Sequence, residues 1–243
     1  MQAAEGEPSA LGRWRRLLPT LPWLRFAHKC LGLAVRAGLI LSIYTSAAIF
    51  SARLGTVSLA AHQVVQQLQQ LQLAMTWAFL SVGQALVSSV YREDATSAAA
   101  ARALGSRVVL WAAFLALALA VATWAARGVL PALFVKGCAS TGAVLDAIAP
   151  AVLPACAMLV FSCNNGIEGV LLGAGDTRFV VGMYPPSVLL GLGCLAVAWV
   201  SGGGLAGVWY ALAAYYCSLM LLFGLRWAAP LRWMRGPLHL GAL

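Results

Sequence analysis

The sequence predicts an all-α integral membrane protein built as a bundle of six spanning helices, and three observations predict it. Of the 243 residues, 62% are hydrophobic and 9% are charged. Soluble domains carry about 25% charged residues, so this chain has too few to cover a globule with a hydrated surface. Mean hydropathy is +0.85. Six apolar runs are each long enough, at about 20 residues, to cross a bilayer as a helix.

These six runs follow one another with short breaks that contain proline, glycine or charge. None shows the strict alternation over about ten residues that is typical of a membrane β-barrel. The predicted spans are 32–52, 57–90, 106–126, 147–174, 179–200 and 205–225. We divide the chain into a basic segment along the membrane surface (1–30), the six-span unit (31–226) and a tail (227–243).

The charge balance is basic, with 16 Lys and Arg against 7 Asp and Glu. The positive residues lie between the apolar runs rather than on one amphipathic face, which argues against nucleic acid as a partner and favours membrane lipid. Six spans place both termini and twelve positive residues on one side, predicted to be cytoplasmic or stromal. The sequence fits a plasma, vacuolar or plastid envelope membrane equally. The opposite side has three: Arg53, Arg127 and Lys136.

Glu168 is the single acidic residue inside the apolar run Ala151–Ala174. A charge at bilayer depth costs roughly 2.5 to 3.5 kcal/mol, so it usually faces a polar cavity or a partner. Asn164 lies on the same helical face, four residues earlier, and Asn165 follows it. Burial disfavours the charged carboxylate, which suits Glu168 to proton uptake or cation binding; a permanent pair with Arg36 or a backbone group is the alternative. Arg36, near the basic end of its span, is expected to snorkel to the surface.

The first half of the second span is rich in amides. Four of them follow the spacing i, i+3, i+4, i+7 of one helical face: Gln63, Gln66, Gln67 and Gln70. His62, Gln69 and Gln72 widen this face. Glutamine donates and accepts hydrogen bonds, so the face suits a water-filled cavity or a polar ligand. Amides that only join helices are the alternative, and for His62 a structural role at the helix start is the preferred interpretation.

We predict no enzymatic activity, no metal and no cofactor. An intramembrane serine protease needs a serine nucleophile and a histidine base at depth. His62 is the only candidate base, and the chain has no Gly-x-Ser-x-Gly elbow. The cysteines lack Cys-x-x-Cys spacing, so they do not suggest a metal site. The glycine-rich string 173–178 follows no predicted strand, which argues against a nucleotide-binding loop; it predicts a helix end and a charged turn.

Three strings occur in order on the predicted helices: LGTVSLAAHQVVQQL, SVGQALVSS and IEGVLLGAGDTR. Together they resemble the carboxy-terminal half of a MATE (multidrug and toxic compound extrusion) transporter, closest to the DinF-like branch found in bacteria and plant plastids. The similarity covers roughly residues 31–226. It is carried most specifically by the short strings at 60–63, 84–87 and 173–176.

The resemblance implies one six-helix lobe of a twelve-helix transporter that exports organic, often cationic, compounds in exchange for H+ or Na+ by alternating access. It places Gln84 at a position of the family pattern and Glu168 where DinF-like members commonly carry an acid. Ser162–Asn165 is more polar than that pattern. These residues, with the span-two amides, are expected to line the substrate cavity.

The first lobe of such a transporter is missing from the sequence. We therefore expect a fragment of a longer gene, with a degraded paralogue and a dimerising half-transporter as alternatives. The missing lobe or a second copy is accordingly an expected partner. Two other functions stay open: a flippase for lipid-linked precursors from the same superfamily, and a membrane scaffold or partner subunit without transport activity.

Overall fold

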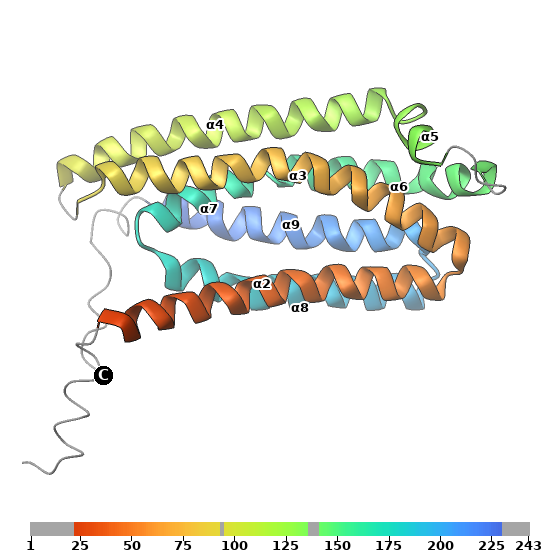
Figure 1. The fold of residues 1–243 in the computed structure, drawn as a ribbon, viewed down its shortest axis with the longest axis horizontal. Coiled ribbons are helices and arrows are strands. Elements are labelled where there is room, and N and C mark those ends of the chain that lie inside the picture. Colours follow the sequence, from red (N-terminus) through yellow and green to blue (C-terminus); the bar gives the residue numbers. More distant parts are fainter. Residues whose placement is uncertain (1–21, 93–94, 136–140, 230–243) are drawn as a thin grey trace, which may run out of the picture.

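The structure is a computed structural model that describes residues 22–92, 95–135 and 141–229, and these residues form helices without a strand (Figure 1). Six stretches are long and apolar enough to cross a membrane, which confirms the all-α six-span bundle. A short α5 (Leu130–Phe134) follows α4, and α6 and α7 together form one span. The other helices are α2 (Pro22–Arg53), α3 (Thr56–Val90), α4 (Ala95–Ala125), α6 (Thr141–Phe161), α7 (Asn164–Gly173), α8 (Thr177–Val200) and α9 (Gly204–Ala228).

Helices α2 and α4 begin much earlier than the spans predicted for them. Helix α2 starts at Pro22, so residues 22–29 of the predicted surface segment continue the first span as helix, and residues 1–21 lie outside the described part. Proline suits the first turn of a helix because the missing N–H would have no partner there. Helix α4 starts at Ala95 because the alanine-rich run 98–101 has high helix propensity. Residues 230–243 of the predicted tail are also outside the described part.

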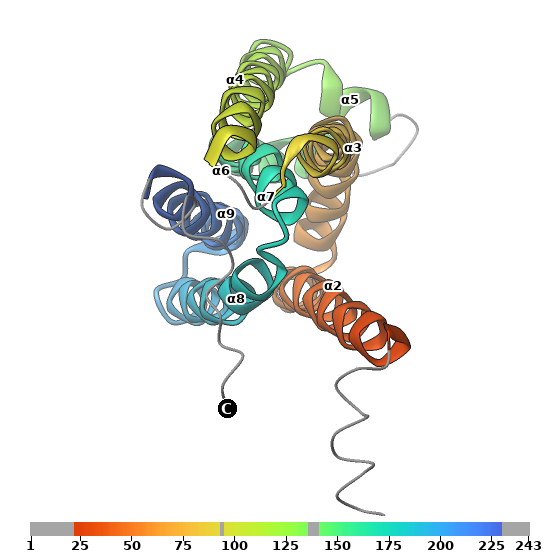
Figure 2. The ribbon, with the colours of Figure 1, turned by 90° about the vertical axis from the view of Figure 1, so that its left-hand side faces the viewer.

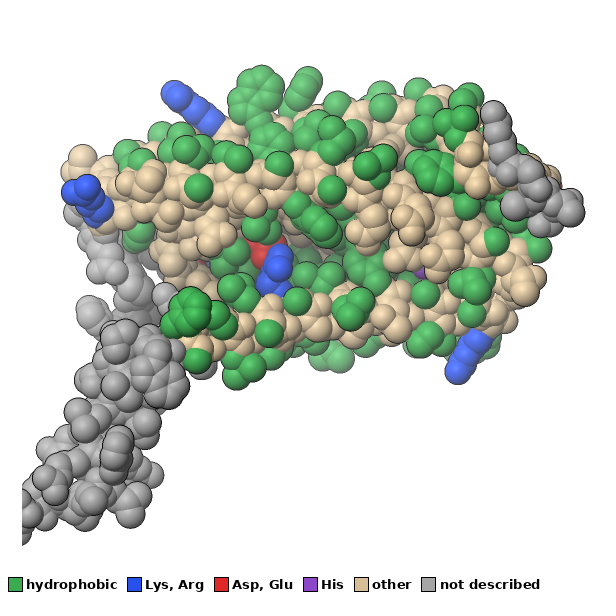
Figure 3. Space-filling model, viewed as in Figure 1, with side chains coloured by type: hydrophobic (Ala, Val, Ile, Leu, Met, Phe, Trp, Pro, Cys, Tyr) green, Lys and Arg blue, Asp and Glu red, His purple; other side chains and the backbone are tan. Residues whose placement is uncertain are grey.

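The helices run side by side along the long axis, with α7 at the centre of the bundle (Figure 2). Helix α7 contacts α3, α4, α8 and α9, and α9 also packs along α6 and α8. Helix α2 pairs mainly with α8 and makes fewer contacts with α3. The surface between α2 and α3 is hollowed into a groove, and at its floor a basic side chain lies against an acidic one (Figure 3).

The outer surface of the bundle is strongly apolar. On α4, large hydrophobic side chains point outward at successive turns, among them Leu110, Trp111, Phe114, Leu117 and Val121. Such a belt is far larger than the exposed apolar patches of soluble monomers and suits contact with lipid tails. With six apolar helices, this surface is that of a multi-pass membrane protein. The cytoplasmic or stromal placement of the termini stays a prediction.

Candidate functional site

The fourth span is broken into two helices where its polar residues begin. Helix α6 contains Pro150 and Pro154 and ends at Phe161. Ser162 donates its hydroxyl hydrogen to the carbonyl oxygen of Leu159 at 2.6 Å, and helix α7 starts at Asn164. Short polar side chains compete for backbone hydrogen bonds and so favour a break over a continuous helix. The break separates α6 from the short helix that carries Asn164, Asn165 and Glu168.

Glu168 forms an ion pair with Arg36 inside the bundle. A guanidinium nitrogen, Nη2 of Arg36, lies 2.7 Å from Oε1 of Glu168, whose side chain is 0% exposed. The hydroxyl of Tyr184 donates to the other carboxylate oxygen at 2.8 Å. The predicted snorkelling of Arg36 is therefore wrong: the side chain turns inward, because α2 and α8 bring it beside a buried carboxylate. The pair with Arg36, considered as an alternative, is present.

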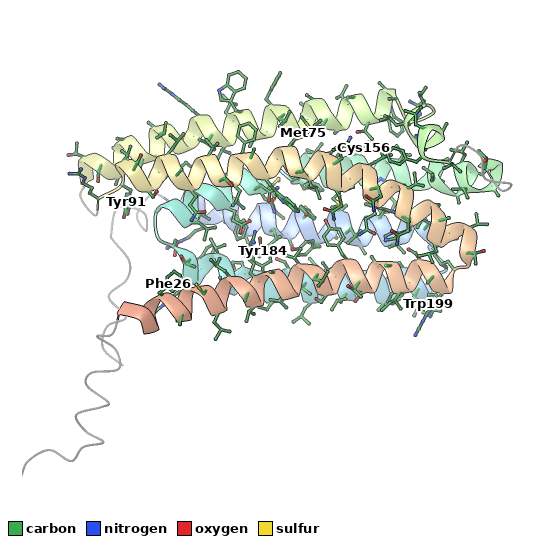
Figure 4. All side chains as sticks on the ribbon, in the orientation of Figure 1. Phe26, Met75, Tyr91, Cys156, Tyr184 and Trp199 are labelled. Atoms are coloured by element: carbon green, nitrogen blue, oxygen red, sulfur yellow. The ribbon has the colours of Figure 1, made fainter. Side chains whose placement is uncertain are left out.

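Tyr184 contacts this ion pair, three further tyrosines form a linked cluster in the interior, and sequence reasoning missed all four. The Arg36 guanidinium carbon lies 4.8 Å from the ring centroid of Tyr184, which projects from α8 into the interior (Figure 4). Tyr44 of α2 and Tyr216 of α9 share a hydrogen bond at 3.0 Å between their hydroxyls. The ring of Tyr215 packs edge-on against Tyr216, and all four tyrosines are buried. The one signal available was a pair of adjacent tyrosines in the middle of the sixth span.

The inner face of α3 carries polar residues at intervals of seven. His62, Gln69 and Thr76 are each buried, because two turns of helix separate them and place them on the same face. Gln69 donates to the backbone carbonyl oxygen of Ala155 in α6 at 2.9 Å, and the Asn165 amide donates to the Thr76 hydroxyl at the same distance. These bonds fix both halves of the broken span against α3.

The predicted glutamine face points away from the interior of the bundle. Gln63 and Gln67 are exposed on the outside of α3, and Gln66 and Gln70 are half-buried beside them. These four amides therefore enclose no cavity among the residues that the structure describes, and their role as cavity lining stays a prediction that depends on a partner. The sequence could not choose the inner face, because amides occupy positions around most of the helix.

The remaining predicted site residues, His62, Asn164 and Gln84, lie in three different environments. His62 packs its ring against Trp209, with 5.5 Å between the ring centroids, which agrees with the structural role preferred for it. Asn164 is buried, and its Oδ1 has no hydrogen-bond partner among the described residues. The side chain of Gln84 is exposed on α3, and the residue meets α7 through its backbone at Gly173.

The glycine-rich turn after α7 is closed by a second ion pair. Helix α7 ends at Gly173 and α8 begins at Thr177, as the sequence predicted, and Gly175 takes φ +82°, a value that favours glycine. Nε of Arg226 donates to Oδ2 of Asp176 at 2.7 Å. This contact ties the end of α9 to the turn that follows the Glu168 helix.

A matched pair of glutamine substitutions distinguishes the two faces of α3. We expect Gln69→Ala to lower the free energy of unfolding by roughly 2 kcal/mol, because it removes a buried hydrogen bond and leaves a cavity. Gln67→Ala should change it by less than about 0.5 kcal/mol. Unfolding of the purified protein in mixed micelles measures both values. Equal effects of the two substitutions would contradict the inward placement of Gln69.

The arrangement is a neutral, hydrogen-bonded pair of opposite charges beside a break in a spanning helix, at the floor of an open groove. Such a pair can exchange partners with a proton or an ionic solute. Comparisons of the chain with protein-family models, with curated proteins and with solved structures find no match. The similarity to MATE transporters accordingly stays a prediction that rests on the sequence strings.

Proposed function

We infer that the chain forms part of a secondary active membrane transporter, which moves organic solutes in exchange for H+ or Na+. The observation that carries this proposal is the ion pair of Arg36 and Glu168 beneath the groove. Ionisable residues inside membrane spans are rare because they are costly, and those that occur commonly mark substrate or ion pathways. A purely structural role is a weaker explanation of this buried ion pair, because apolar residues of similar size often stabilise a folded protein as well or better.

The broken span gives further support to a transport role. Secondary transporters commonly place their substrate and ion sites at discontinuous helices. Here the break at Ser162 and Cys163 lies within one turn of Asn165 and two turns of Glu168. Because α7 contacts four neighbouring helices, a movement of this short helix would reach α2 and α8 through Glu168. Together with the sequence strings, this supports a MATE-type antiporter lobe.

The residues on the outer face of α3 support the proposal that a partner unit packs there, across the groove from α2. A stripe of exposed or half-buried small and polar residues runs along this helix, flanked by exposed apolar side chains such as Leu71 and Trp77, whereas the outer surface of α4 is dominated by large apolar side chains. Small and polar residues mark helix–helix contact in membranes rather than contact with lipid. We propose a second six-helix unit here, either a complementary lobe or a second copy of the chain. The stripe consists of Ala60, Gln63, Gln67, Gln70, Ala74, Ala78, Ser81, Ala85 and Ser88.

Coupled export from cells that produce the protein tests this function. We expect Glu168→Gln to reduce solute export driven by an H+ or Na+ gradient by about tenfold or more, because the amide cannot exchange a proton or hold a cation by charge. Asp146→Asn is the matched control, since it removes an exposed carboxylate at the far end of the bundle. Equal membrane levels of the three proteins, measured by immunoblot, exclude a loss of protein. Unchanged export by Glu168→Gln would refute the role.

A further inference from the structure

The two charges of the buried pair are unequally accessible. The Glu168 side chain is 0% exposed, and each of its oxygens already faces a partner, Arg36 or Tyr184. The Arg36 side chain is 20% exposed, and the groove between α2 and α3 opens onto a basic side chain that lies against an acidic one (Figure 3). A solute that enters the groove therefore meets a guanidinium first, with the carboxylate behind it.

The guanidinium also keeps unused hydrogen-bonding capacity. Arginine has five N–H donors, and the contact with Glu168 runs through Nη2 alone. Nε of Arg36 has no hydrogen-bond partner among the described residues, but it is itself buried and so closed to a solute. An acidic solute can thus add charge-assisted hydrogen bonds only at the exposed part of Arg36, before the pair with Glu168 is broken.

A cationic solute meets the opposite situation. To reach Glu168 it must first displace Arg36, and until then it lies against a like charge, which is unfavourable at low dielectric. The other acidic side chains that the structure describes are no substitute. Asp176 is held by Arg226 at the turn after α7, and Asp146 is exposed near the start of α6.

From this asymmetry we propose that the groove binds organic anions, specifically carboxylates, and that Arg36 is the residue that binds the acid group. The proposal rests on the transport function proposed above and reverses the cationic substrate expected from the sequence. Apolar side chains line the groove around the pair and suit the hydrocarbon part of such a solute (Figure 3). Glu168 then acts as the internal counter-ion that the substrate carboxylate replaces.

Binding of matched small probes to the purified full-length chain in nanodiscs tests the proposal. Benzoate and succinate supply the acid group, benzamide is the neutral control, and phenyltrimethylammonium is the cation. We expect at least one acid to bind by calorimetry, with neither control binding measurably. Arg36→Gln should weaken acid binding by about tenfold or more, whereas Arg53→Gln, at the exposed end of α2, should leave it unchanged.

Two further variants separate binding from folding. Arg36→Lys keeps the charge but loses the planar fork, so we expect intermediate affinity. The double variant Arg36→Gln/Glu168→Gln leaves no uncompensated charge, so it should fold and still fail to bind the acids. Absence of acid binding to the folded wild-type chain, preference for the cation, or acid binding that survives Arg36→Gln would each overturn the proposal. Coupled export of the cation with no binding of the acids would refute the anion preference but not the transport function. Binding of the acids without export of any solute would refute the transport function alone.

Discussion

Glu168→Leu is expected to lower the free energy of unfolding by roughly 3 kcal/mol, because removal of one member of a buried ion pair leaves the other without compensation. The substitution takes both acceptors away from their donors, Nη2 of Arg36 and the hydroxyl of Tyr184. Arg36 is partly exposed, so water can partly solvate its charge after the carboxylate is removed, and this limits the loss of stability. Unfolding of the purified protein in mixed micelles, followed by circular dichroism, measures the change.

Leu133→Ala serves as the control for that measurement. Leu133 is an exposed side chain on the short helix α5, far along the chain from the pair, and its truncation should change stability by less than about 0.5 kcal/mol. A loss of less than about 1 kcal/mol for Glu168→Leu would contradict a buried, hydrogen-bonded carboxylate.

Gly169→Ala is expected to be the most disruptive single-methyl change in the bundle. A Cβ at Gly169 would lie 2.7 Å from Cα of Leu80 and closer still to the carbonyl oxygen of that residue, both backbone atoms of α3. A side chain can relieve such a clash by changing its rotamer, but backbone atoms cannot. Helices α3 and α7 must therefore move apart. We expect a loss of roughly 3 kcal/mol, together with a weakened hydrogen bond from Asn165 to Thr76.

Gly182→Ala on α8 is the matched control for this change. A Cβ at Gly182 meets nothing within 4 Å, so the added methyl group should leave stability unchanged or raise it by about 0.5 to 1 kcal/mol through helix propensity. Thermal unfolding of the two variants in the same detergent gives the comparison. Equal stability of Gly169→Ala and Gly182→Ala would show that α3 and α7 do not touch at Gly169.

The membrane fold could be predicted from the sequence because span length and apolar composition are local properties. Glu168 could be found in the same way, since an acidic residue within an apolar run is conspicuous without any knowledge of its neighbours. The spacing Gly169-x-x-x-Gly173 is typical of helices in close contact, and both glycines lie against the α3 backbone. Each of these features depends on residues within a few turns of one another.

The partners of Glu168 could not be predicted, because they depend on which helices become neighbours. Arg36 lies three spans earlier in the chain, and its position near the basic end of its span favoured snorkelling. Tyr184 and Tyr216 occupy positions in apolar spans where a tyrosine could equally serve as ordinary core. The inner face of α3 was ambiguous for a related reason: the sequence predicted one broad face of amides, and only the contact of Gln69 with α6 shows which part of it points inward.

A double-mutant cycle between Arg36 and Glu168 tests the central claim that these two residues form an interacting pair inside the bundle. The free energy of unfolding is measured for the wild type, Arg36→Leu, Glu168→Leu and the double variant. We predict a coupling energy of about 2 kcal/mol, with the double variant more stable than Glu168→Leu alone, because two leucines leave no buried charge behind. Additive effects, with a coupling energy below about 0.5 kcal/mol, would contradict the pair and with it the site from which the function is inferred.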